Sequence, residues 1–216
     1  MIPRVSLYTF VDAAYLHGRP PKTVAQALCD GGSDLIQLRA KDLPASQVRK
    51  MAEEIQPITR AAGVALVIND YPDIAVDVGA EYCHLGQEDF FGSGKTHIRE
   101  LPASTKGVHF GLSTHAPDQA QRAITAGPNY IAIGPVFPTG TKPTARPVTL
   151  EYVRWAASHV QMPWFAIGGI TLDNLGEVVA AGARRICVVS AILNSYDIAQ
   201  ACQTFKKRLV SAVESS

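Results

Sequence analysis

The sequence predicts a (β/α)8 barrel formed by residues 1–216 as a single domain. Short apolar segments typical of strands alternate with helical patterns along the whole chain, and eight such units can be counted. The strand candidates are four to six residues long and mostly apolar on both faces, as buried parallel strands are. A doubly wound open sheet is the main competitor, but no G-x-G-x-x-G motif follows the first strand candidate. The barrel is therefore favoured.

Each strand candidate is a short run of mainly apolar residues, and a turn or a polar loop follows it. We expect strands at residues 5–9, 35–39, 64–68, 82–85, 107–112, 129–133, 164–167 and 186–189. The sixth strand has the sharpest end, because Gly134 and Pro135 follow it directly.

Helices are expected between the strands, and several carry end signals. Gly63, Gly79, Gly127 and Gly182 each follow a helical pattern directly, and Pro117 opens one. We expect helices at residues 23–30, 46–62, 73–78, 97–101, 117–126, 150–159, 173–181 and 198–213. A polar loop is expected over 12–21, and a glycine-rich loop is expected before the helix near 97–101.

The charge balance and the cysteines bound the class of protein. The sequence has twenty Lys and Arg residues and nineteen Asp and Glu residues, so no overall electrostatic field favours binding to nucleic acid or to an anionic membrane. Small-molecule chemistry is the better expectation. The four cysteines stand singly, without a C-x-x-C pair or a zinc spacing, and predict reduced thiols in a cytoplasmic protein. We also expect no secretion leader and no membrane span.

Polar residues gather just past the strand candidates, where barrels of this type place their active sites. Gln37, Arg39 and Lys41 occupy alternate positions along strand two and the residues after it, so their side chains should project to the barrel interior. Arg39 and Lys41 form the cationic set of the site. Two cations on one interior face are costly to desolvate unless an anion meets them. Arg39 with Lys41 therefore predicts a diphosphate site, although Lys41 and Asp42 beyond the strand could also lie in solvent.

Asp70 and Asp89 are carboxylates from neighbouring loops. Such a pair, with waters and substrate phosphates, is how proteins usually hold Mg²⁺. The alternative is that Asp70 only forms the turn of Asn69-Asp70-Tyr71-Pro72. Beside the cationic set, the two carboxylates predict metal-assisted diphosphate chemistry.

The loop 134–142 leaves the sixth strand with two hydroxyls, a glycine and a cation. Thr139, Thr141 and Lys142 would suit an anion, although such a segment is also typical of a surface turn. Gly168-Gly169 and Ser190 end strands seven and eight, where barrels bind a monophosphate through backbone N–H groups. A second phosphate site is therefore predicted, although Gly168-Gly169 could equally form a tight turn.

The histidines carry weaker signals. His84 and His109 lie within strand candidates and are interpreted as packed or hydrogen-bonded core residues. His115, two residues past Ser113, is within reach of the site. No G-x-S-x-G and no H-E-x-x-H occurs, so covalent catalysis by serine and zinc hydrolysis are disfavoured.

Five segments together resemble the thiamine phosphate synthase family across nearly the whole chain. They are Gln37-Leu38-Arg39-Ala40-Lys41-Asp42, Asn69-Asp70, His84-Leu85-Gly86-Gln87-Glu88-Asp89, residues 134–142, and Ala166-Ile167-Gly168-Gly169-Ile170 with Val189-Ser190. The resemblance implies a transferase with a (β/α)8 barrel. Its reaction joins hydroxymethylpyrimidine diphosphate to a thiazole phosphate, or to the carboxylated form of that phosphate, and releases pyrophosphate.

The resemblance also implies residue roles. Arg39, Lys41 and Lys142 would hold the diphosphate, with Thr139 and Thr141 beside the pyrimidine and the diphosphate. Lys142, Ser113 and Arg39 would be the catalytic residues. Asn69, Asp70 and Asp89 would lie at the Mg²⁺ end, with Asp70 and Asp89 as metal ligands. Gln37 and Ser113 would contact the pyrimidine, and backbone at Gly169, Val189 and Ser190 would receive the thiazole phosphate. The implied partners are these small molecules, and the sequence leaves the oligomeric state open, a homo-oligomer included.

Two other hypotheses remain. The thiazole tautomerase branch of the fold lacks the diphosphate and metal machinery, and there we would expect the acidic Asp89 lost and a histidine at Ser113. Both Asp89 and Ser113 are present, which favours the synthase. The third hypothesis is a barrel that binds thiamine precursors without turnover. Asp70, Asp89 and Lys142 argue against it, because a binding module needs no metal-bound leaving-group site.

Overall fold

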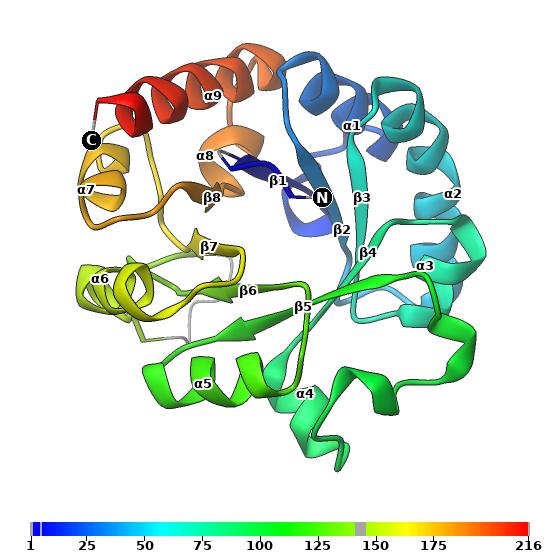
Figure 1. Cartoon of the computed structure of the whole chain (residues 1–216). Coiled ribbons are helices and arrows are strands. Elements are labelled where there is room, and N and C mark those ends of the chain that lie inside the picture. The colour runs from blue at the N-terminus through cyan, green and yellow to red at the C-terminus, as the bar shows by residue number, and fades with distance from the viewer. Residues whose placement is uncertain (1, 5, 141–145, 216) are drawn as a thin grey trace.

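Eight parallel strands close into a barrel in the computed structural model, which describes residues 2–4, 6–140 and 146–215. Each strand pairs with the next along the chain, and the first pairs with the last (Figure 1). The strands are β1 (Ser6–Asp12), β2 (Leu35–Arg39), β3 (Ala65–Asn69), β4 (Tyr82–Leu85), β5 (His109–Thr114), β6 (Tyr130–Ile133), β7 (Trp164–Ile167) and β8 (Arg185–Cys187). The predicted barrel is confirmed, and the open sheet is excluded.

Helices surround this barrel (Figure 1). They are α1 (Pro21–Asp30), α2 (Ala45–Ala62), α3 (Pro72–Val78), α4 (Gln87–Gly92), α5 (Pro117–Thr125), α6 (Thr149–His159), α7 (Leu175–Ala180), α8 (Ser190–Leu193) and α9 (Ile198–Glu214). Short 3-10 turns lie at η1 (Ala13–Tyr15), η2 (Ile98–Glu100) and η3 (Ala103–Thr105). None of these described helices is long and apolar enough to cross a membrane.

The prediction for the fourth unit was wrong. The expected helix at 97–101 is only the 3-10 turn η2, because Pro102 disfavours a helical conformation at Leu101, which is extended with ψ 155°. The helix of this unit lies earlier, at α4, in the segment that was expected to be a glycine-rich loop. Phe90 anchors α4, since its side chain is buried. The short α8 was not predicted either.

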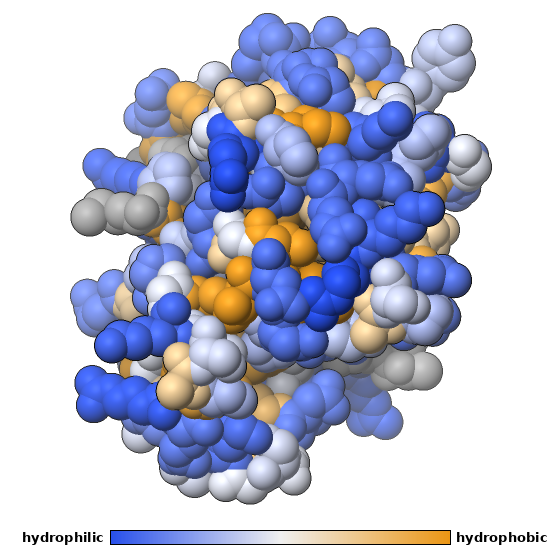
Figure 2. Space-filling view, turned by 90° about the vertical axis from the view of Figure 1, so that its right-hand side faces the viewer, coloured by the Kyte–Doolittle hydropathy of each residue, from blue (hydrophilic) through white to orange (hydrophobic). Residues whose placement is uncertain are grey.

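The helices cover the barrel with their apolar faces. On α2, the side chains of Val48, Ala52 and Ile55 are buried, whereas Glu53 and Glu54 are exposed. Figure 2 shows the face on the α2 and α3 side as mostly hydrophilic. All eight strands are parallel, so their carboxyl ends meet at one mouth, and the loops that follow them converge there.

Candidate active site

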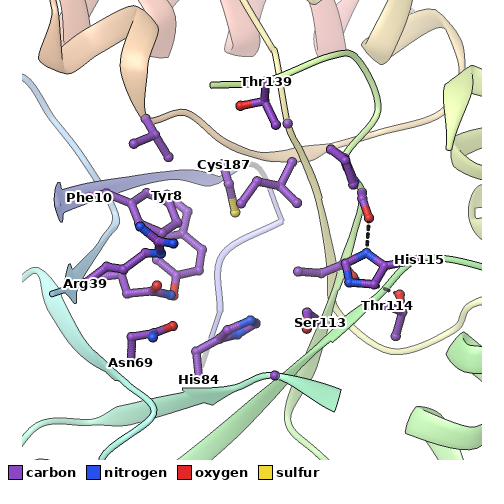
Figure 3. A pocket seen from close by; sticks show the side chains of 18 of the residues that line it. Tyr8, Phe10, Arg39, Asn69, His84, Ser113, Thr114, His115, Thr139 and Cys187 are labelled. Atoms are coloured by element: carbon purple, nitrogen blue, oxygen red, sulfur yellow. Dashed lines mark hydrogen bonds between the residues drawn. The ribbon is translucent and has the colours of Figure 1, made fainter. Parts of the chain in front are cut away.

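A cavity of about 570 Å³ lies at the carboxyl ends of the barrel strands. Figure 3 shows Arg39 and Asn69 on one side of it, with Thr139 and His115 on the other. Every residue that the resemblance assigned to the site, and that the structure describes, lines this cavity. These residues are Gln37, Arg39, Lys41, Asn69, Asp70, Asp89, Ser113, Thr139, Gly169, Val189 and Ser190. Thr141 and Lys142 lie outside the described residues.

The cationic side of the cavity comes from the end of β2. Arg39 is its last residue, and the Arg39 Nη1 lies 2.7 Å from Oδ2 of Asp12, a carboxylate that is only 1% exposed. Lys41 lies two residues beyond the strand and is half-exposed, but it still lines the cavity, and its Nζ is 3.5 Å from Oδ2 of Asp70. The two cations therefore face one space, as predicted, but the strand alternation with Gln37 extends only to Arg39, and Lys41 reaches the cavity from beyond the end of β2.

Asp12 was missed by the sequence reasoning. It ends β1, next to Arg39 in the β1–β2 register, and its Oδ1 also accepts a hydrogen bond of 3.0 Å from the backbone N–H of Ala14. The available signal was a lone carboxylate shortly after an apolar strand candidate, at the start of the expected polar loop 12–21. The buried carboxylate holds Arg39 in place, because it is a fixed counter-charge beside the guanidinium.

The carboxylate side is formed by β3 and α4. Asp70 follows β3 in the left-handed region, with φ 65°, and its Oδ2 accepts a hydrogen bond of 2.6 Å from Nδ2 of Asn69. Asp89 lies in the first turn of α4, where a negative charge is favourable to the helix dipole. No three His, Cys, Asp or Glu side chains among the described residues form a metal-binding cluster. Asp70 and Asp89 are thus a pair of carboxylates around one cavity.

The segment 87–89 corrects the prediction of a glycine-rich loop after strand four, because it lies in α4. Glu88 and Asp89 line the cavity from the first turn of α4, whereas Gln87 is buried. The backbone N–H of Gln87 donates to Oγ of Ser113 over 3.3 Å. Ser113 itself lies within β5, which runs two residues further than predicted. This contact fixes the start of α4 against the strand that carries Ser113.

Two histidines line the cavity. His115 contacts the carbonyl oxygen of Gly134 through Nδ1, and its Nε2 is 3.5 Å from Oε1 of Glu88. His84 is hydrogen-bonded to the hydroxyl of Tyr130, as expected for a core residue, but it also borders the cavity. Burial, helped by the charge of Lys41, lowers the pKa of His84 from 6.5 to about 4. His84 is therefore neutral at physiological pH.

The depressed pKa of His84 predicts a pH dependence of stability. Between pH 6.5 and about 4 the unfolded chain protonates this histidine and the folded chain does not, so the free energy of unfolding falls as the pH is lowered. We expect a loss of about 2 kcal/mol relative to His84→Gln between pH 7 and pH 4.5, in urea unfolding without added metal. Parallel profiles for the two proteins would contradict the assignment.

Gly169 lies where the segment after β6 crosses the end of β7. Its φ is 64°, and a Cβ there would come within 2.5 Å of the carbonyl oxygen of Pro138 and 2.7 Å of the Cβ of Phe137. The backbone N–H of Phe137 donates to the carbonyl of Gly168 over 3.1 Å. Glycine is required here because a side chain would push this segment, which leads to Thr139, away from β7.

We therefore expect Gly169→Ala to destabilise the protein by about 2 kcal/mol and to raise KM for a ligand that binds beside Gly169 in the cavity. Gly176→Ala is the matched control. Gly176 lies within α7, and a Cβ added there would have nothing within 4 Å, so alanine should stabilise the helix by about 0.5 kcal/mol. Thermal unfolding and steady-state kinetics check both. Equal effects of the two variants would refute the requirement for glycine at position 169.

Comparisons with known proteins agree with this geometry. The sequence model of the family described as thiamine monophosphate synthase matches residues 7–192. A thiamine-phosphate synthase of Thermus thermophilus is 43% identical over 83% of this chain and 84% of its own length. One of Lawsonia intracellularis is 38% identical over 95% of this chain and 93% of its own.

Solved structures show the same likeness. A thiamine phosphate pyrophosphorylase from Pyrococcus furiosus superposes with a TM-score of 0.82 and 26% identity over 97% of this chain and 98% of its own. A 3-hexulose-6-phosphate synthase, with a TM-score of 0.63, 16% identity and coverage of 96% of this chain and 99% of its own, shares the fold. The family match spans most of the chain, and the described residues that the resemblance assigned to the site line one cavity. The chain belongs to the thiamine monophosphate synthase family.

Proposed function

We propose that the cavity carries out the condensation implied by the family, in which 4-amino-2-methyl-5-hydroxymethylpyrimidine diphosphate is joined to 4-methyl-5-hydroxyethylthiazole phosphate or its carboxylated form. The products are thiamine monophosphate and pyrophosphate, and carbon dioxide is also released when the thiazole carries the carboxyl group. The observation that carries this proposal is the convergence of Arg39 and Lys41 with Asp70 and Asp89 on one cavity. Cations and carboxylates around one space suit a diphosphate with a divalent cation.

The diphosphate would lie against Arg39 and Lys41. Negative charge develops on the departing pyrophosphate, so cations held in place beforehand stabilise the transition state more than the substrate. Asp12 keeps the Arg39 guanidinium oriented before the substrate arrives. Thr139 would contact the same phosphates, and Thr141 and Lys142 join this set as assignments from the sequence alone.

The residues present fit Mg²⁺, which prefers oxygen ligands and keeps several waters. Asp70 and Asp89 would hold it as carboxylate ligands, with Asn69 hydrogen-bonded to Asp70 beside them. When bound, the ion would supply Lewis-acid stabilisation of the leaving pyrophosphate. In the structure, Lys41 is the counter-charge of Asp70.

The pyrimidine would bind against Gln37 and Ser113, and the thiazole phosphate would bind to backbone at Gly169, Val189 and Ser190. We propose a dissociative order: the bond to the diphosphate breaks first, and the thiazole nitrogen then captures the pyrimidine methyl cation. Little proton transfer is needed in such a reaction. A neutral His84 in the cavity is consistent with this, because it adds no positive charge beside the cation.

The competing activities are an isomerisation of the thiazole by a tautomerase and binding without turnover. Ser113 occupies the position where a tautomerase histidine was expected, and Asp89 still lines the cavity. Both observations support the transferase. We also propose a cytoplasmic location, because all four cysteines are free thiols and three of them are buried.

The purified protein, incubated with Mg²⁺ and both phosphorylated precursors, is expected to form thiamine phosphate and pyrophosphate in equal amounts. Lys142→Ala and Asp89→Ala should each lower turnover strongly without changing the thermal unfolding temperature. Intact binding of both precursors without product would refute the synthase. Isomerisation of the thiazole alone would support the tautomerase.

A further inference from the structure

A hydrogen-bonded chain crosses the barrel below the cavity and joins two of its walls. Nε2 of Gln37 donates to the hydroxyl of Tyr8 over 2.5 Å, and the hydroxyls of Tyr8 and Tyr130 are 3.0 Å apart. The Tyr130 hydroxyl lies 3.1 Å from Nδ1 of His84. Figure 3 shows Tyr8 and His84 at the cavity. Gln37 on β2 and His84 on β4 are therefore connected through two tyrosines.

The sequence makes room for this chain. Tyr8 and Tyr130 are at most 1% exposed, in a barrel interior where polar atoms are costly without partners. The Tyr130 ring passes over Gly111, where a Cβ would lie 2.1 Å from its Cζ. A glycine inside a strand weakens the strand, so its presence shows that the ring needs this space. Burial raises the pKa of both tyrosines, which keeps the hydroxyls protonated.

The number of available protons determines which group donates and which accepts in each of these hydrogen bonds. Tyr8 accepts from the Gln37 amide, and among the described residues the remaining partner for its own proton is the Tyr130 oxygen. Tyr130 then donates to Nδ1 of His84. A neutral imidazole that accepts at Nδ1 carries its proton at Nε2.

Gln37 and His84, the two ends of this hydrogen-bonded chain, both border the cavity. No buried side-chain nitrogen or oxygen among the described residues lacks a partner. Oε1 of Gln37 and Nε2 of His84 make no hydrogen bond there, and both residues line the cavity, so these two atoms are exposed to it. The cavity thus presents an acceptor from one wall and a donor from another.

We propose that Tyr130 is a positioning residue that, with Tyr8, holds His84 as the Nε2–H tautomer and Gln37 with its oxygen toward the ligand. The acceptor and donor together complement an aminated heteroaromatic ring, which offers an amino hydrogen and a ring nitrogen. That ligand class rests on the proposed function, in which the aminopyrimidine is the ring bound here. The tautomer of His84 does not depend on it.

The tautomer can be read without substrate. Long-range ¹H–¹⁵N spectra of the free enzyme, with the His84 signal assigned from its loss in His84→Gln, should show an unprotonated Nδ1 and a protonated Nε2. Tyr130→Phe should give a mixture of tautomers. Tyr8→Phe should also give a mixture of tautomers. The contact between Tyr130 and His84 remains in this variant, but the Tyr8 hydroxyl, whose proton makes Tyr130 donate to His84, is gone. A protonated Nδ1 in the wild type, or unchanged spectra in both variants, would overturn the proposal.

Kinetics test the positioning. Tyr130→Phe should raise KM for the pyrimidine diphosphate about tenfold, as for the loss of about 1.4 kcal/mol, and leave KM for the thiazole phosphate within about twofold. Tyr152→Phe is the matched control. It removes a buried hydroxyl that donates to Thr114 over 2.8 Å and takes no part in the hydrogen bonds between Gln37 and His84. It should change neither KM nor the His84 spectrum. Equal rises in both KM values for Tyr130→Phe would indicate a merely structural role and refute the proposal. An inactive wild type with the expected spectrum would refute only the proposed function.

Discussion

Arg39→Met should lower kcat/KM for the pyrimidine diphosphate by about a thousandfold, the loss expected when one preorganised stabiliser of developing charge is removed. The variant should also lose about 3 kcal/mol of stability, because the buried Asp12 is left without its counter-charge. Steady-state kinetics and urea unfolding measure the two losses separately.

A second substitution separates the two effects. Asp12→Asn in the Arg39→Met background removes the unpaired charge, so stability should recover while activity stays low. Arg49→Met is the matched control, since Arg49 pairs with Asp77 and Asp73 on the outer surface of α2 and α3. It should change activity less than twofold. Recovery of activity together with stability in the double variant would show that Arg39 is only structural.

Asp70→Asn should lower kcat about a hundredfold and raise the Mg²⁺ concentration needed for half-maximal activity at least tenfold. Asparagine has the same shape and tolerates the left-handed conformation of this position, so the fold should stay intact. The variant loses one carboxylate from the proposed metal pair and frees Lys41 from its partner. Mg²⁺ titrations of activity at saturating substrate check this.

The control for Asp70→Asn is Asp73→Asn, three residues along the chain in the first turn of α3, where the carboxylate faces Arg49 instead of the cavity. It should leave the Mg²⁺ requirement unchanged. If Asp70→Asn lowered kcat with an unchanged Mg²⁺ requirement, Asp70 would act by orienting Lys41 and would not be a metal ligand.

Much of the site could be predicted because parallel strands bring their carboxyl ends to one edge. Residues a short distance past strand candidates, such as Lys41 and Asp70, needed only the strand order to be placed around one mouth. The alternation of Gln37 and Arg39 added which side of the strand they occupy. Local pattern and topology together were sufficient for these residues.

Other parts depended on contacts that no local pattern encodes. Glu88 and Asp89 were expected in a loop, but they lie in the first turn of α4, a helix whose Phe90 is buried in the core. Asp12 gains its role from Arg39, which is 27 residues away in the sequence. His84 was interpreted as a core residue, and it is hydrogen-bonded in the core, yet it also faces the cavity.

By itself, the sequence determined the barrel, the order of its strands and the set of charged and glycine residues at their ends. Hydrophobic periodicity and turn residues act over a few neighbours, so they can be read along the chain. Only the tertiary structure decided which groups hold these residues in place. Tyr8 and Tyr130 are 122 residues apart, and their hydroxyls meet only because barrel closure brings β1 and β6 around one interior. Positioning by such partners is a property of closure, since it depends on contacts between strands that are distant in the sequence.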